Sequence, residues 1–326
     1  MLASAVLRLE EQVKNHASLD SLRRLKQARR LLFKLETVGG ALDTPEDWFI
    51  RGGKRAVEQY GKTMGGLVVK PLTARYHFNY SFNAKRRVLM SATIGGIGTF
   101  ASELGLDDYD VRQVPNQYPP DQRQIHILDV PPMGRKKRNE SLDDYKARKR
   151  KQVQEIVNAI RKCPEHWSGI IHVNSKAQAR DLAREIRYKS PEVGDRIWIT
   201  PGADGDYVAT DEQLNAWEQR KLKQSNSLAI SWSMWEGVDL LDEKIDIVAK
   251  IPFPYLGDEY EMARLDYSHS FFNWRAATKV SQGLGRTRRG RPQDYGEENG
   301  FVAIADGSWT RIRKYLSNDV QEAIVE

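Results

Sequence analysis

The segment "QGLGRTRRG" at residues 282–290 has the residue types and spacing that most directly suggest chemistry. A guanidinium is planar and permanently charged, and it can bind a carboxylate or a phosphate through two parallel hydrogen bonds. The neighbouring glycines would let such an anion approach the backbone closely. Because a pattern of helical period precedes the segment, we expect it to end a long helix, where cations also favour the helix dipole. The partner of these arginines is therefore a nucleotide, a nucleic acid or only water.

Composition places the chain among globular proteins and mildly favours a polyanionic partner. It has 326 residues, 40% of them hydrophobic and 29% charged, with a net charge of +7 and a pI near 9.3. This length allows one large domain or two ordinary ones. A basic balance favours nucleic acid among partners, although basic proteins without such partners are common.

Cysteine and histidine usage excludes several kinds of site. Cys163 is the one cysteine, so no internal disulfide and no iron–sulfur cluster can be built from this chain alone. The six histidines show no HxxxH or HExxH spacing, and we expect no metal site. No apolar run approaches the roughly 20 residues needed to cross a bilayer. The amphipathic N-terminus lacks a basic leader, so we expect a reducing cytoplasm and no membrane partner.

Strand-like and helical patterns alternate along most of the sequence. From residue 67 onward, helical patterns at 141–162, 175–188, 210–224 and 259–285 separate short apolar runs of strand length. Such alternation predicts an α/β fold with a mostly parallel sheet that is covered on both faces. The apolar runs are LVVKPL (67–72), RRVLMSAT (86–93), RQIHILDV (123–130), SGIIHVNS (168–175), DRIWIT (195–200), SLAISWS (227–233) and KIDIVAKIPFP (244–254).

The N-terminal part has a different texture. Residues 1–36 have helical period with a break near Ser18, and we expect Gly39 and Gly40 to stop the helix. We expect the glycine-rich, basic stretch 51–66 to be loop-like or only partly helical. The charge run at 135–152 is either a solvated helix of mixed charge or a track for phosphates.

Polar or glycine-bearing segments follow the candidate strands. In parallel α/β sheets, ligands bind beyond the carboxyl ends of the strands. Ser-Ala-Thr follows "VLM", Asn174 and Ser175 follow "IIHV", "WSMWEGVD" follows "LAIS", and "PFP" follows "IVAKI". We therefore expect this edge of the sheet to be functional.

Two glycine motifs favour other functions but lack the required context. "AVEQYGKT" (56–63) loosely matches a phosphate-binding loop that would use Lys62 and Thr63, yet no convincing strand precedes it. "GGIGTFA" (95–101) imitates a dinucleotide-binding turn and would suggest a nicotinamide-dependent enzyme. The acidic residues that follow it stand closer in the sequence than the about 20 residues expected for the acid that binds the ribose of a dinucleotide.

Three segments in this order resemble the conserved motifs of one family. "VLMSATIGG" resembles motif III of superfamily 2 helicases, "SMWEGVDL" (233–240) resembles motif V, and "QGLGRTRRG" resembles motif VI. The WEGVDL wording, the following "IPFP" and "DYG…VAIAD" (294–306) narrow the resemblance to helicases of the XPD/DinG type. It covers about residues 66–310.

The resemblance implies a domain organisation. Residues 1–65 would be a helical segment, either arch-like or an insertion in the first motor lobe. Residues 66–94 would end that lobe with the Ser-Ala-Thr motif. Residues 95–326 would form a RecA-like second motor domain.

The resemblance also implies roles in ATP hydrolysis. Arg286 and Arg289 would be the catalytic arginines that reach the γ-phosphate when two lobes close. Gln282 would orient the attacking water or bridge to motif V. Glu236 and Asp239 would hold the arginines in place. Together with Gly237 and Gly285, these two acidic residues would form part of the nucleotide site. Arg288 departs from the usual apolar residue of the motif and would face DNA or solvent.

Other residues would bind single-stranded DNA or couple the lobes. Ser233 and the backbone at Gly237 would bind a DNA phosphate, and Asn174 with Ser175 occupies the position of motif IV. Trp235, like Trp232 and Phe253, would stack on a base or pack in the interior. Coupling between the lobes would use Ser91, Ala92 and Thr93.

Several elements of the family do not occur in this sequence. There is no credible Walker A loop, no DExx acid pair before Ser91, and none of the cluster-binding cysteines. The chain thus resembles the C-terminal half of such a helicase and would need a nucleotide-binding lobe from elsewhere, which would carry the Mg²⁺ ligands for ATP. We expect the chain alone to hydrolyse ATP negligibly. The alternative is a catalytically silent nucleic-acid-binding module that has kept the fold.

Overall fold

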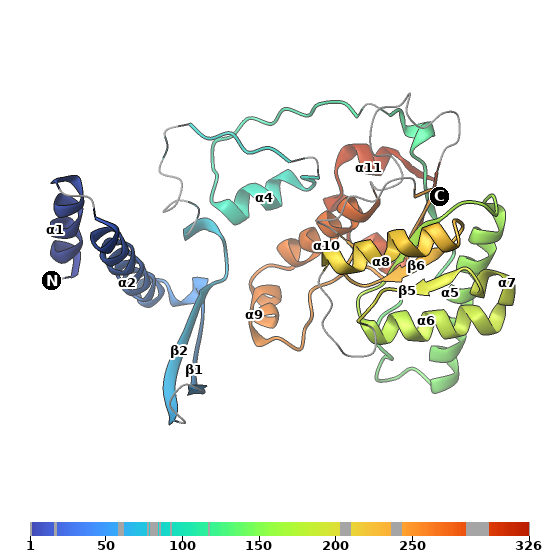
Figure 1. The fold of residues 1–326 in the computed structure, drawn as a ribbon, viewed down its shortest axis with the longest axis horizontal. Coiled ribbons are helices and arrows are strands. Elements are labelled where there is room, and N and C mark those ends of the chain that lie inside the picture. Colours follow the sequence, from blue (N-terminus) through green and yellow to red (C-terminus); the bar gives the residue numbers. More distant parts are fainter. Residues whose placement is uncertain are drawn as a thin grey trace. The chain divides into compact units, whose positions relative to one another are not determined.

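The computed structural model divides the chain into two compact units. It describes residues 2–15, 18–57, 62–76, 78, 84, 86–91, 93–116, 118–202, 210–235, 243–284 and 300–325. The first unit comprises residues 1–86, 103–105 and 256–268, and the second comprises residues 87–102, 106–255 and 269–326. Figure 1 labels the elements of both units, and each unit is described by itself.

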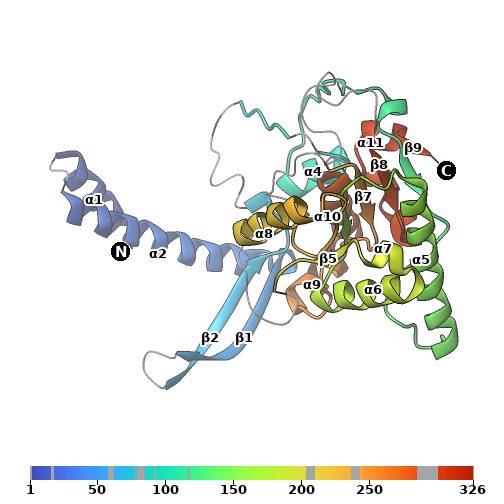
Figure 2. The ribbon, with the colours of Figure 1, turned by 45° about the vertical axis from the view of Figure 1, so that its right-hand side comes forward.

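A parallel sheet of seven strands forms the centre of the second unit (Figure 2). The strands run in the spatial order β5-β6-β4-β7-β8-β3-β9, and every neighbouring pair is parallel. This confirms the predicted α/β class. The strands are β3 (Ile125–Ile127), β4 (Gly169–His172), β5 (Ile197–Ile199), β6 (Leu228–Ser231), β7 (Ile245–Val248), β8 (Phe301–Ile304) and β9 (Ile324–Val325).

Helices connect these strands and were largely expected from the sequence. The long ones are α5 (Leu142–Lys162), α6 (Lys176–Lys189), α8 (Thr210–Lys223) and α10 (His269–Leu284). The shorter helical elements are α4 (Ile97–Leu104), η3 (Pro120–Gln122), α7 (Pro191–Gly194), η5 (Gly307–Arg311), η6 (Arg313–Tyr315) and α11 (Asn318–Glu322).

Local sequence explains where α5 and α6 begin and end. The Ser141 hydroxyl accepts a hydrogen bond from the amide of Asp144 at the start of α5, and Ser175 accepts one from Gln178 at the start of α6. Such caps satisfy amides that lack a partner within the helix. Basic residues occupy the last turn of each helix, where they complement the dipole.

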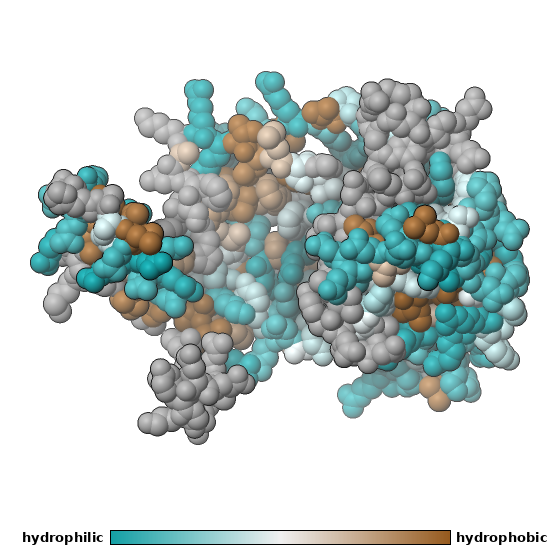
Figure 3. Space-filling view, viewed as in Figure 1, coloured by the Kyte–Doolittle hydropathy of each residue, from teal (hydrophilic) through white to brown (hydrophobic). Residues whose placement is uncertain are grey.

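Helices cover the two faces of the sheet with separate apolar clusters. On one face, α5 and α6 pack on the strands through Ile156, Ile160 and Ile186, all fully buried. On the other face, α10 packs through Ala277 and Val280 against the strand residues Val248 and Ile304 in the same cluster. Alternate residues of a strand point to opposite faces, so a continuous apolar strand can feed both clusters. Over the helices of this unit, Figure 3 shows mainly hydrophilic residues, which form their solvated faces.

The first unit contains a helix pair, a hairpin and α9 (Glu259–Tyr267). Helices α1 (Leu2–Asn15) and α2 (Leu19–Asp43) are joined by an ion pair between Arg29 and Glu10. The break expected near Ser18 is present, since Ser18 caps α2 in a reciprocal arrangement with Ser21. After the short helix η1 (Pro45–Asp47), strands β1 (Trp48–Val57) and β2 (Lys62–Pro71) pair antiparallel.

Three expectations about local structure were wrong. Gly39 and Gly40 do not stop the helix, because α2 continues to Asp43. The stretch 51–66 was expected to be loop-like or partly helical, but its described residues belong to the β1–β2 hairpin. The single helix expected over 259–285 is two helices, because Ser268 lies between α9 and α10.

The expected strand at 86–93 does not form in the described part of this segment. Residues 87–91 are irregular, and the side chains of Val88 and Met90 are 83% and 89% exposed. A strand requires a neighbouring strand for its backbone hydrogen bonds. None of the strands of the described residues pairs with this segment.

Candidate functional site

Three of the motifs recognised in the sequence meet around the side chain of Trp235. This residue follows β6, and only 1% of it is exposed. Its indole N–H donates a hydrogen bond to the carbonyl of Val173, just after β4, at 3.0 Å. Its ring lies 4.5 Å from the His172 ring, measured between centroids. Trp235 therefore joins the segment after β6 to the segment after β4.

The end of α10 packs on the same indole. A Cβ atom added to Gly283 would lie 3.1 Å from Cε3 of Trp235 and 3.8 Å from Nε2 of His172. A side chain at this position would require the indole to shift by a few tenths of an ångström, which favours glycine as the first glycine of "QGLGR". Gln282 precedes it at a partly exposed position. The Lys279 ammonium, one turn earlier in α10, lies 5.9 Å from the centre of the Trp235 ring.

A serine turn shapes the chain immediately after β6. The hydroxyl of Ser231, the last residue of the strand, accepts hydrogen bonds from the amides of Ser233 at 3.3 Å and Met234 at 3.1 Å. Ser233 is half-buried, and its hydroxyl donates to the side-chain oxygen of Gln213 in α8. The turn positions Trp235 and directs the chain toward the acidic part of the motif.

Asn174 and Ser175 both have structural partners. The Asn174 side-chain amide donates to the carbonyl of Ile251 at 2.8 Å, which links the ends of β4 and β7. Its side-chain oxygen is buried without a hydrogen-bond partner among the described residues. Ser175 caps α6. These contacts account for both residue types and neither require nor exclude a nucleic acid.

A buried histidine and a buried aspartate lie beneath this junction. Nε2 of His172 lies 3.3 Å from Oδ1 of Asp246 in the neighbouring strand β7, and both side chains are almost completely buried. The four polar atoms of these side chains make no hydrogen bond among the described residues, so this close approach is the polar contact that the structure gives to two groups that burial has removed from water. The pair lies on the face of the sheet that α10 covers.

Asp306 is a buried carboxylate at the end of the segment "VAIAD" and was not among the expected site residues. Its Oδ1 accepts hydrogen bonds from the amides of Met133 at 2.8 Å and Ser308 at 2.9 Å. Its Oδ2 accepts from the amide of Ile251 at 3.0 Å and from Lys250 at 3.2 Å. Asp306 thus holds together the segments that follow β3, β7 and β8. The sequence signal that could have identified Asp306 was its position directly after an apolar strand.

The acid pair "DEKI" (242–245) is explained structurally at Glu243. Its carboxylate accepts hydrogen bonds from Ser168 at 3.0 Å and from the Trp217 indole at 2.7 Å, and it pairs with Lys221 at 3.1 Å. Burial raises the pKa of Glu243. Glu243 lies just before β7, at the opposite edge of the sheet from Asn174 and Trp235. It therefore belongs to the core and not to the edge that carries the motifs.

The charge run at 135–152 is partly neutralised within the chain. Arg148 binds Glu140 at 2.8 Å through two nitrogens, and Lys149 and Lys151 pair with Asp181 and Asp129. Part of this basic stretch is therefore already engaged by carboxylates.

Several residues assigned by resemblance lie outside the described residues. In the Ser-Ala-Thr motif, the Ser91 hydroxyl accepts a hydrogen bond from the amide of Thr93 at 3.2 Å. The residues with assigned roles that lie outside the described part of the chain are Ala92, Glu236, Gly237, Asp239, Gly285, Arg286, Arg288 and Arg289.

The structure shows the setting of three aromatic residues for which base stacking and interior packing were both expected roles. Trp235 is enclosed by the protein and cannot stack on a base in this conformation. Phe253 stacks on Phe272 with the ring centroids 5.6 Å apart. Trp232 is half-buried, with the Lys176 ammonium 5.9 Å from its ring centre.

The described residues include neither a cluster suited to hold a metal ion nor a helix suited to cross a membrane. No group of three or more His, Cys, Asp or Glu side chains is arranged to hold a metal ion there. None of the described helices is long and apolar enough to cross a membrane.

Comparison with known families and proteins was made on the whole chain. The family model described as the helicase C-terminal domain matches residues 156–323, slightly more than half of the chain. No curated protein matches the sequence. The matched region begins in α5 and includes β4, the turn after β6, α10 and Asp306, which are the elements that build the junction around Trp235. The chain therefore contains a RecA-like parallel sheet and belongs to the helicase C-terminal domain family of the XPD/DinG type.

Proposed function

We propose that this chain is the C-terminal motor half of an ATP-dependent DNA helicase that moves along single-stranded DNA. The observation that carries the proposal is the convergence of motifs IV, V and VI on Trp235. A motor must transmit the state of its nucleotide to its grip on DNA. The buried side chain of Trp235 in motif V contacts motif VI on one side and the segment of motif IV on the other, and so links them physically. The family match supports the helicase context.

In this proposal, Arg286 and Arg289 stabilise the charge that develops on the transferred phosphoryl group. Phosphoryl transfer depends mainly on positioning and charge stabilisation, so a planar, permanent cation suits the task. In the sequence they stand two and five residues after Leu284, the last residue of α10, and the end of this helix rests against Trp235. Gln282 stands four residues before Arg286 in the sequence and would orient water or contact motif V. Glu236 and Asp239 would hold the arginines in place.

DNA contacts are assigned to the polar groups after β4 and β6. Ser233 and the backbone near Gly237 would bind one phosphate, and Asn174 and Ser175 would border the path of the strand. The buried, unpartnered oxygen of Asn174 fits a site at which a further donor, from water or a ligand, arrives. DNA rather than RNA rests on the family resemblance, whereas the expected cytoplasmic location rests on cysteine usage.

We further propose that a separate nucleotide-binding lobe completes the enzyme and supplies the Mg²⁺ ligands. Residues 66–94 would belong to the tail of that first lobe, residues 95–326 to the second motor domain, and residues 1–65 to an insertion. Support comes from the apolar side chains of Val88 and Met90, which are exposed just before the Ser-Ala-Thr motif. A strand of this sequence would bury them only by joining a sheet from elsewhere.

The decisive experiment supplies the missing lobe. The chain is mixed with a Walker A/B lobe of a helicase of the same type, and phosphate release is measured with and without single-stranded DNA. DNA should stimulate hydrolysis, and Arg286→Ala should reduce the rate by about 10³-fold or more, as for other arginine fingers. The matched control, Arg184→Ala on the exposed face of α6, should leave the rate unchanged. DNA binding without hydrolysis would favour the silent nucleic-acid-binding module, and robust ATPase in the chain alone would contradict the need for a partner lobe.

A further inference from the structure

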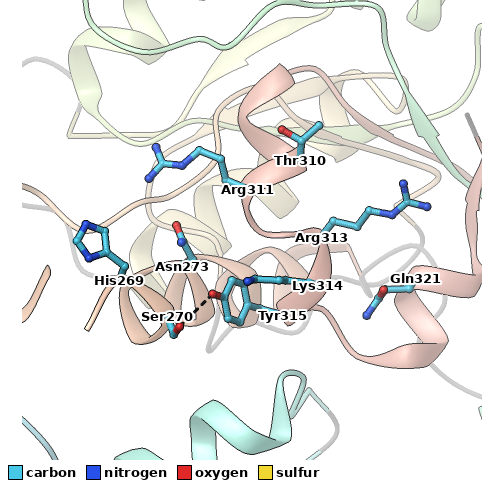
Figure 4. Close-up of a pocket in the computed structure, with 9 residues that line it drawn as sticks. All are labelled: His269, Ser270, Asn273, Thr310, Arg311, Arg313, Lys314, Tyr315 and Gln321. Carbon is cyan, nitrogen blue, oxygen red and sulfur yellow. Dashed lines mark hydrogen bonds between the residues drawn. The ribbon is translucent and has the colours of Figure 1, made fainter. Parts of the chain in front are cut away.

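A basic pocket lies in the second unit at the opposite end of α10 from motif VI (Figure 4). It has a volume of about 600 Å³ and is formed by the first turns of α10, by the segment η5–η6 and by α11. The lining residues are His269, Ser270, Asn273, Thr310, Arg311, Arg313, Lys314, Tyr315 and Gln321.

The charge of this pocket has one sign. Two arginines and a lysine line it together with a histidine, and none of the lining residues is an aspartate or a glutamate. The ion pairs found among the described residues include neither Arg311 nor Lys314. This contrasts with the charge run at 135–152, whose cations Arg148, Lys149 and Lys151 are paired with carboxylates.

Aromatic rings support the two cations and give them a defined position. The Arg311 guanidinium lies 4.7 Å from the centre of the Phe253 ring, and the Lys314 ammonium lies 5.1 Å from that of Tyr315. Tyr315 is buried, and its hydroxyl forms a hydrogen bond of 3.3 Å with Ser270 of α10. Cations that rest on aromatic faces keep their charge available to a ligand and lose less side-chain freedom on binding.

The shape of the pocket favours a chain of phosphates over one compact anion. Figure 4 shows Arg311 extending toward the first turns of α10, whereas Arg313 extends in the other direction, on the side of Gln321. The positive groups are thus spread along the pocket.

The pocket is distinct from the proposed nucleotide site. Helix α10 runs from His269, which lines the pocket, to Leu284, next to Gly283. Fourteen residues separate His269 from Gly283, which corresponds to about 21 Å at the helical rise of 1.5 Å per residue. The described end of α10 that packs on Trp235 is therefore well separated along the helix from the end that lines this pocket.

We propose that this pocket binds phosphodiester groups of a single-stranded nucleic acid, as a second phosphate site remote from motif VI. The inference rests on the proposed nucleic-acid-binding function but requires no ATP hydrolysis. Arg311 and Lys314 supply the charge, and Arg313 extends the basic surface along the strand.

The test measures binding of a fluorescently labelled oligodeoxythymidine to the full chain, without nucleotide, over a series of salt concentrations. The variant combines Arg311→Gln with Lys314→Gln, and the control combines Lys189→Gln with Lys223→Gln, which removes two equally exposed charges elsewhere. The pocket variant should lose about tenfold in affinity, and the slope of log K against log salt should become shallower by about 1.4, or 0.7 for each lost phosphate contact. The control should change neither quantity appreciably.

A second arm separates a strand from a free phosphate ligand. Inorganic pyrophosphate is titrated against the wild-type chain and the pocket variant, and the melting temperature is followed. The proposal is overturned if the pocket variant keeps the DNA affinity and the salt slope of the wild type. This holds even if pyrophosphate raises the melting temperature of the wild type and not that of the variant, because the pocket would then bind a free phosphate and not a strand. Because both arms omit ATP and the partner lobe, a failed reconstitution of ATPase activity would leave this test readable. All four substituted side chains are exposed, and circular dichroism checks that the variants fold.

Discussion

Gly283 lies against the indole of Trp235 so closely that an added Cβ would stand 3.1 Å from Cε3 and 3.3 Å from Cζ3. The tryptophan cannot easily move away, because its N–H is bonded to Val173 and its ring packs on His172. The last turn of the motif VI helix therefore takes its position from a side chain of motif V. A shift of either segment changes where the residues after α10 begin.

The first prediction concerns Gly283→Ala. Alanine normally stabilises a helix interior by about 1 kcal/mol relative to glycine. Here the methyl group would press on a fixed indole, and overpacking of this kind costs about 1–3 kcal/mol. We expect a net loss of unfolding free energy, measured by urea denaturation, and a larger loss for Gly283→Val.

The control for this substitution is Gly98→Ala in α4, also in the second unit. An added Cβ at Gly98 has no heavy atom within 4 Å. We expect the control to be neutral or slightly stabilising. Equal behaviour of the two alanine variants would show that the contact with Trp235 does not constrain α10.

The second prediction concerns the pair of His172 and Asp246. Both side chains are at most 1% exposed, and they have each other as neighbours at 3.3 Å. Removing one partner of a buried pair leaves the other unpaired and costs about 3–5 kcal/mol. We expect Asp246→Leu and His172→Leu each to lower the unfolding free energy by an amount in this range.

The double variant separates pairing from simple packing. Two leucines remove both polar groups, so the loss in the double variant should be clearly smaller than the sum of the two single losses. Additive losses would show that the two side chains contribute independently and that the pair is not energetically coupled.

The third prediction is that Asp306→Ala severely destabilises the second unit. The carboxylate accepts from three backbone amides and from Lys250, and it is 1% exposed. Its removal leaves buried donors and a partly buried ammonium without their acceptor, so we expect a loss of about 3–5 kcal/mol. Thermal melting followed by circular dichroism measures this loss.

A matched control is Asp129→Ala. Asp129 pairs with Lys151 at 2.8 Å, but its side chain is 91% exposed. Exposed ion pairs contribute about 0–1 kcal/mol. Similar melting temperatures of the two variants would contradict the role assigned to Asp306.

The parts of the fold that the sequence predicted are those in which one local pattern decides the structure. The strands β4, β6 and β7 are mostly apolar, and burial on both faces explains this composition, although β4 contains His172 and β7 contains Asp246. The segments after β4 and β6 lie at one edge of the sheet, as parallel strands require, and the end of α10 meets them at Trp235. That the helix end packs there depends on side-chain contacts between distant parts of the sequence.

The expectations that failed depend on partners distant in the sequence. Gly40 remains helical, and an added Cβ there would lie 3.2 Å from the Tyr76 ring, so its glycine permits close packing and does not end the helix. The hairpin was obscured by glycines at the centre of both strands. For Trp235 the sequence left base stacking and core packing open, because an aromatic residue in a motif suits both and periodicity cannot separate them.

The fourth prediction concerns the reactivity of Cys163, which ends α5. Burial raises the pKa of its thiol from 9.0 to about 11, and the thiol donates a weak hydrogen bond to the carbonyl of Ala159 at 3.4 Å. Only the thiolate reacts with iodoacetamide, so at pH 8 about one molecule in a thousand is reactive. The alkylation rate of the native protein should rise about tenfold per pH unit past pH 10, whereas that of the denatured chain should level off near pH 9. Because the folded state holds this proton more tightly than the unfolded state, the thiol should also make unfolding free energy fall as pH rises from about 9 to 11. A native alkylation profile that levels off at or below pH 9 would show that the thiol is not desolvated as the packing at the end of α5 requires.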